Sequence, residues 1–123
     1  MAKKGYIAEV ERKEQLELEG FHVTRNSGSI GANDLIAVKN CIPQEVIDAG
    51  LCSEIKFDVR YEQVKKTREK TFYFNEDSKY ELSRLKEISE KFKIPCFFAI
   101  KFTYKGWKII NVNDLDGSPI KWQ

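Results

Sequence analysis

The sequence has 123 residues, of which 41% are hydrophobic and 33% charged, and its formal net charge is +2. This composition is that of a folded chain with a charged surface, and the length suits one core, so we expect a single domain over residues 1–123. No apolar run approaches a membrane span and no basic-then-apolar leader is present, so we expect a cytoplasmic protein with no membrane partner.

The first quarter of the chain predicts a helix and then a strand. Residues 5–20 are rich in helix formers and end at a glycine suited to a C-terminal cap. Residues 21–26 alternate in the manner of a strand, with Arg25 on the core side near its end. An arginine at such a place needs an anionic partner, either a carboxylate or a DNA phosphate.

A loop of small residues, 26–33, follows this strand and contains Ser27 and Ser29. Its glycines let a backbone approach closely, and its hydroxyl and N–H groups are donors. We consider two interpretations, a flexible connection and a loop that contacts phosphates.

Two apolar runs, 35–38 and 51–57, predict the central strands. Asp34 opens the first, and Glu54 and Lys56 lie two apart in the second, on one face of the strand. If the runs pair as a hairpin, Asp34 approaches Glu54, and two carboxylates beside a lysine suit a hard cation with an activated water. The alternative is a solvated strand edge with a weak ion pair.

Residues 56–70 hold six basic and three acidic side chains, and we expect a polar loop here after a strand that ends near residue 59. Arg60, Lys65 and Lys66 are its candidate DNA contacts, since a local basic excess attracts phosphates. The alternative is a solvated, mobile loop.

The remaining elements complete an α/β fold. We expect a short helical turn over 43–50, a short strand at 71–74, a long helix capped by Asn75, and a hairpin of strands at 95–102 and 107–112. The strands before and after the long helix can run parallel through a crossover. The predicted fold class is a central mixed β-sheet flanked by helices.

Cysteine usage gives no zinc-site spacing. Cys41 and Cys52 flank the loop between the central runs, where a disulfide is conceivable, but buried free thiols are the default. The lone His22 is assigned no role.

Taken together, five segments resemble the archaeal Holliday-junction resolvases, within the PD-(D/E)xK nuclease superfamily with its restriction-endonuclease-like fold. The resemblance covers nearly the whole chain. Its segments are Lys4-Gly5-x-x-Ala8-Glu9, Gly20-Phe21-x-Val23-x-Arg25, Gly28-Ser29, Asp34-Leu35-x-Ala37 and Glu54-Ile55-Lys56.

The resemblance implies a role for each matching residue. Glu9, Asp34 and Glu54 resemble the acidic ligands of Mg²⁺, for which Mn²⁺ is a substitute, with the Ile55 carbonyl as a further ligand. Lys56 resembles the residue that positions or deprotonates the attacking water. The DNA-contacting positions that support catalysis are Arg25 and Ser29.

One departure concerns the N-terminal acid. The family commonly has arginine directly after this glutamate, whereas here Val10 follows Glu9 and the Glu-Arg pair is Glu11-Arg12. Spacing from Gly5 and Gly20 favours Glu9, and Glu11 is the runner-up.

The resemblance implies a homodimer that makes paired, symmetric, metal-dependent nicks in a four-way DNA junction. The candidates for the dimer contact are the aromatic residues Phe72, Tyr73 and Phe74 and the exposed part of the last hairpin. Two alternatives stay open: another PD-(D/E)xK endonuclease acting on linear, flap or damaged DNA, and a non-catalytic DNA-binding module.

Overall fold

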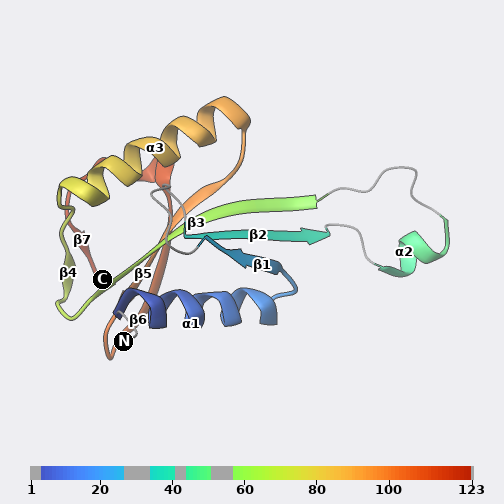
Figure 1. Ribbon diagram of the computed structural model, residues 1–123, viewed down its shortest axis with the longest axis horizontal. Coiled ribbons are helices and arrows are strands. Elements are labelled where there is room, and N and C mark those ends of the chain that lie inside the picture. The colour runs from blue at the N-terminus through green and yellow to red at the C-terminus, as the bar shows by residue number, and fades with distance from the viewer. Residues whose placement is uncertain (1–3, 27–33, 41–43, 51–56, 123) are drawn as a thin grey trace.

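The computed structural model describes residues 4–26, 34–40, 44–50 and 57–122. The described chain contains a mixed sheet, two long helices and several short elements (Figure 1). In chain order these are α1 (Lys4–Leu18), β1 (His22–Arg25), β2 (Leu35–Asn40), α2 (Gln44–Asp48), β3 (Phe57–Thr67), β4 (Thr71–Phe72), α3 (Glu76–Phe92), β5 (Cys96–Phe102), β6 (Gly106–Asn111), the 3₁₀ turn η1 (Val112–Asp114) and β7 (Ile120–Lys121).

The central sheet has five strands in the order β1-β2-β3-β5-β6. Its neighbours are antiparallel except β3 and β5, which run parallel and are joined through α3. Helices α1 and α3 lie on opposite sides of the sheet (Figure 1). The predicted mixed sheet flanked by helices and its final hairpin are therefore confirmed. A parallel crossover through α3 is also present, and its first strand is β3.

The extent of β3 corrects the prediction for the middle of the chain. The structure continues this strand from Phe57 to Thr67, through residues expected to form a basic loop. Its first half pairs with β2, from Asn40↔Phe57 to Leu35↔Glu62, and its second half pairs with β5. The expected hairpin, in which residues 51–57 run beside 35–38, is therefore wrong, since Val38 pairs with Val59.

Each face of the sheet has its own core. On the α1 side, Ala8 and Leu16 of the helix pack with small and branched residues of the sheet. On the α3 side, Leu82 and Leu85 pack with the aromatic residues of β5. Strand alternation assigns the residues of β3 to these faces in turn, Val64 toward α1 and Tyr61 toward α3.

A buried charge network joins α1 to β3. The Arg12 guanidinium donates to both carboxylate oxygens of Glu62, at 2.7 and 3.0 Å, and Arg60 Nε lies 2.9 Å from Glu62 Oε2. Glu62 is completely buried and Arg12 is 5% exposed. Two guanidinium groups therefore compensate one carboxylate inside the protein, which satisfies the rule that buried charges are paired.

Helix α3 begins at a capping box. The Asn75 side chain accepts from the Ser78 backbone N–H, and the Ser78 hydroxyl accepts from the Asn75 N–H, both at 2.8 Å. This fixes the entry of the crossover helix over the sheet. The helix confirms the predicted cap.

The aromatic segment before α3 differs from the expectation for a dimer contact. Phe72 is buried, and its ring packs edge-on against Phe74, with centroids 5.1 Å apart. Phe74 also packs against Phe98 of the α3-side core. Only Tyr73 of the three is largely exposed, so this segment gives a partner little apolar surface.

Within the described part of the chain, no helix is long and apolar enough to cross a bilayer.

Candidate active site

Asp34 directly precedes β2, at the point where β3 extends beyond the end of β2. Its backbone N–H donates to the Glu62 carbonyl, and this bond is the last of the ladder at that end. Further along β3, the Val64 backbone N–H donates to the Asp34 carboxylate at 2.9 Å. The Gln63 side-chain Nε2 donates to the same oxygen at 2.8 Å. The Asp34 carboxylate therefore lies at the fork of β2 and β3, where the pairing of the two strands ends.

This position perturbs the acidity of Asp34. Burial raises its pKa from 3.8 to about 6, against the opposing effect of the hydrogen bond from the Val64 N–H, and the nearby charge of Glu9 raises it further. Such a carboxylate is held ionised at a cost, which a cation would remove. Perturbed carboxylates of this kind are typical of functional sites.

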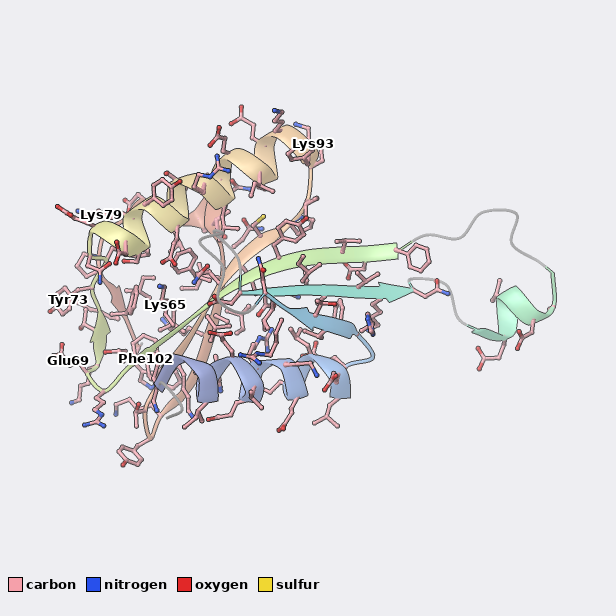
Figure 2. The ribbon with its side chains drawn as sticks, in the orientation of Figure 1. Lys65, Glu69, Tyr73, Lys79, Lys93 and Phe102 are labelled. Atoms are coloured by element: carbon pink, nitrogen blue, oxygen red, sulfur yellow. The ribbon has the colours of Figure 1, made fainter. Side chains whose placement is uncertain are left out.

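Gln63 and Lys65 flank Val64 on β3 and share the face that α3 covers. The Lys65 side chain is labelled in Figure 2. Its ammonium reaches Glu81 of α3, with 2.6 Å between Nζ and Oε1. Burial raises the pKa of Glu81, the ion pair with Lys65 lowers it, and the charge of Asp34 raises it. Gln63, Lys65 and Glu81 therefore belong to the surroundings of Asp34.

The two candidate N-terminal acids lie in different places. Glu9 is ion-paired with Arg25, with 3.3 Å between Arg25 Nη2 and Glu9 Oε1, and its charge reaches Asp34. Glu11 instead accepts from the Lys101 ammonium of β5 at 2.5 and 2.6 Å. The predicted anionic partner of Arg25 is confirmed as a carboxylate. Of the two acids, the charge of Glu9 is the one that acts on Asp34.

Several predicted site residues lie outside the described residues: Ser27, Ser29, Glu54, Ile55 and Lys56, together with Cys41 and Cys52. The proximity of Glu54 to Asp34 was expected from a hairpin that the structure replaces with another register. Phe57, directly after Lys56, pairs with Asn40 at the opposite end of β2 from Asp34. The part of β3 beside Asp34 is instead Glu62–Lys65.

The other predicted DNA contacts lie on β3. The Arg60 guanidinium is ion-paired with Glu62 and stacks over the Phe97 ring, 3.8 Å from its centroid, so it is engaged within the protein. Lys66 pairs in register with Lys101. Contact of Arg60 with DNA stays a prediction.

The donors around Asp34 suit a hard cation. Carboxylates of Asp34, Glu9 and Glu81 and the amide oxygen of Gln63 are ligands that Mg²⁺ prefers. In the described ranges, however, no three acidic, histidine or cysteine side chains already converge as a metal cluster. Glu9 and Glu81 are each held by a basic partner, Arg25 and Lys65, which explains this spread.

Sequence reasoning missed Gln63 and Glu81. The spacing of Gln63-Val64-Lys65 repeats that of Glu54-Ile55-Lys56, so a search for an acid-x-lysine motif that admitted glutamine would have found it. Glu81 is one of several glutamates on a charged helix, and no local signal distinguishes it.

Comparison with known proteins identifies the family of the chain. A family model described as archaeal Holliday junction resolvase (hjc) matches residues 1–119. A solved structure of Archaeoglobus fulgidus Hjc, described as a Holliday junction resolvase from an archaeal hyperthermophile, is 20% identical, with a TM-score of 0.67 over 97% of this chain and 84% of that one. This likeness shows a shared restriction-endonuclease-like fold. No curated protein matches. The chain therefore belongs to the archaeal Holliday junction resolvase family, whose members are nucleases that act on four-way DNA junctions.

Proposed function

We propose that this protein resolves four-way DNA junctions by metal-dependent hydrolysis at Asp34, as a homodimer that makes two symmetric nicks. The observation that carries the proposal is the Asp34 carboxylate, buried at the fork of β2 and β3 and bonded to Gln63 and Val64. The family match over residues 1–119 supplies the substrate.

The metal is proposed to be Mg²⁺, with Mn²⁺ as a substitute, held by Asp34, Glu9 and the oxygen of Gln63. A bound Mg²⁺ supplies neutralisation of phosphate charge and an acidified water. The fit rests on the donor set: Gln63 is 3% exposed and its Oε1, buried, has no hydrogen-bond partner within the described chain. Such an orphaned acceptor is costly unless something binds it.

Lys65 is proposed to perform the part that the resemblance implied for Lys56. It follows Gln63 by two residues, on the same face, and its charge lowers the pKa of Asp34. An ammonium beside the scissile phosphate would position the attacking water and stabilise the charge that develops on the phosphate oxygens. Arg25 is proposed to orient Glu9 and to contact DNA.

The homodimer is proposed from the symmetry of the substrate. A junction with two equivalent cutting positions calls for two sites related by a matching two-fold axis. Because Phe72 and Phe74 pack inward, the contact is proposed to lie elsewhere than on that aromatic segment.

A labelled synthetic four-way junction, with the matched linear duplex as control, tests the proposal in Mg²⁺ and in EDTA. Paired Mg²⁺-dependent nicks confined to the junction are expected, and Asp34→Ala should abolish them while binding persists. Cutting of both substrates would move the assignment to a general endonuclease.

One observation favours a second candidate function. Gln63 is neutral at the position where an acid-x-lysine motif carries a carboxylate, which suits a protein that binds junctions without cutting them. Tight junction binding with no cleavage in Mg²⁺ or Mn²⁺ would establish that function instead.

A further inference from the structure

Helix α3 carries a carboxylate to the face of β3 on which Gln63 lies. Glu81 forms an ion pair with Lys65 of β3, and the Glu81 side chain is only 19% exposed. Surface glutamates on such a helix ordinarily extend into solvent, as Glu87 does with 65% exposure. Glu81 is instead directed at the sheet, within reach of the charge of Asp34.

Because the Gln63 side chain is neutral, it contributes no negative charge beside Asp34. Its Nε2 donates to Asp34 at 2.8 Å, so the amide borders the carboxylate, while its Oε1 is buried without a hydrogen-bond partner among the described residues. An amide oxygen can ligate Mg²⁺, but it contributes no charge. A dication there faces Asp34, an arginine-paired Glu9 and a neutral amide.

We propose that Glu81 of α3 supplies the acidic metal ligand that Gln63 of β3 cannot. The inference rests on the proposed function, since it assumes that the metal binds at Asp34. The three carboxylates come from three elements: Glu9 from α1, Asp34 from the start of β2, and Glu81 from α3.

The competing explanation is a plain ion pair in which Glu81 only neutralises Lys65. That explanation accounts for the 2.6 Å contact but not for the unpartnered oxygen of Gln63. It also gives no reason why Asp34 lies within electrostatic reach of two other carboxylates, Glu9 and Glu81, an arrangement that is repulsive until a cation is present.

Mn²⁺ binding to the full chain without DNA separates the two explanations, measured as free Mn²⁺ by electron paramagnetic resonance. Glu81→Gln is expected to weaken Mn²⁺ affinity by about 10- to 100-fold or more. The double variant Gln63→Glu with Glu81→Gln should regain most of that affinity. Glu87→Gln, the same change on the exposed face of α3, should leave affinity unchanged.

Lys65→Met sharpens the comparison. It frees Glu81 from its ion pair, so it should keep or tighten Mn²⁺ binding, whereas a purely structural pair would make both single variants behave alike. Unchanged affinity in Glu81→Gln, or a loss that Gln63→Glu does not rescue, overturns the inference. Circular dichroism of each variant checks that the fold persists.

Junction cleavage tests the proposed function, separately from the Mn²⁺ measurement that tests the inference about Glu81. A wild-type protein that loses Mn²⁺ affinity on Glu81→Gln but never cuts a junction would support the inference and refute the nuclease. A protein that cuts junctions while Glu81→Gln binds Mn²⁺ normally would do the reverse.

Discussion

Arg12 of α1 holds Glu62 of β3 through two hydrogen bonds, at 2.7 and 3.0 Å, in the interior of the protein. The pair fixes α1, which carries Glu9, against the strand that borders Asp34. Arg12→Leu should lower the free energy of unfolding by about 3 kcal/mol, since it removes one partner of a buried pair. Urea denaturation measures this loss.

The control is Lys13→Met on the same helix, whose ion pair with Glu17 is solvent-accessible. It should cost no more than about 0.5 kcal/mol. Adding Glu62→Leu to Arg12→Leu should cost less than the sum of the single changes, because both act on one network. Strict additivity would show that the two residues are energetically independent.

The raised pKa of Asp34 makes a prediction about stability without metal. In the folded protein this carboxyl group ionises near pH 6, against 3.8 in the unfolded chain. Between these values the folded state binds the extra proton, so stability falls as pH rises toward about 6 and the loss persists above it. Asp34→Asn removes the loss and should stabilise the apo-protein at pH 8 by about 1–2 kcal/mol.

Thermal melting in EDTA at pH 8 and pH 4.5 tests this, with the gain expected at the higher pH and largely absent at the lower. Asp116 is the opposite case, an exposed carboxylate whose pKa is lowered by hydrogen bonds from Ser118. Asp116→Asn should therefore bring no gain at pH 8. An Asp34→Asn variant less stable than wild type at pH 8 would contradict the argument.

The pairing register of β3 places Lys65 near Asp34, so we predict that replacing Lys65 impairs junction cleavage and that replacing Lys56 does not. Lys65→Met should reduce single-turnover junction cleavage by about 100-fold or more, as expected for loss of a group that moves or holds a proton in the transition state. Junction affinity in Ca²⁺ should change little. Lys56→Met tests the assignment made from sequence and should retain near-normal cleavage.

Glu54→Gln is the companion variant for the acidic position. If the Asp34 site is built with β3 residues 63–65, both Lys56→Met and Glu54→Gln cut junctions normally. If either abolishes cleavage while Lys65→Met does not, the motif read from the sequence is the catalytic one.

The sequence predicted the elements whose patterns are local. Helix-forming composition and a terminal glycine predict α1, and helical spacing with the Asn75 cap predicts α3. Alternation predicts β1, and the apolar runs predict β2 and β5. Strand β3 was placed too early because its apolar residues are few and its charged ones suggested a loop. Charges are tolerated in a central strand where they are paired, as Glu62 is with Arg12 of α1 and Lys65 is with Glu81 of α3.

The candidate site was predictable only where one segment carries the signal. Asp34 is predicted because it opens a strand, and Glu9 because its segment resembles the family. Gln63 is not predicted, because a neutral amide matches no acidic motif. Glu81 depends on α3 crossing over β3, a relationship between residues 65 and 81 that no local pattern contains.

The last prediction concerns DNA affinity. A surface pocket formed near the β3–β4 turn, the β5–β6 turn and β7 is lined by Lys70, Lys105 and Lys121 with Thr71 and Trp122. Three ammonium groups, with no carboxylate among the described residues of the lining, suit a phosphate of the junction arms. Replacing all three lysines with alanine should weaken binding to junction and duplex alike and reduce the salt slope of log Kd by up to about 3.

The matched control uses a second lysine-containing pocket, lined by Lys79 and Lys86 together with Asp116. Because Asp116 offsets the positive charge there, alanine at Lys79 and Lys86 should change the salt slope less per lysine removed. Fluorescence anisotropy over a range of salt concentrations gives both slopes. An equal loss per lysine at the two pockets would mean that DNA senses only net charge, and the pocket beside Trp122 would then have no special part in holding the junction.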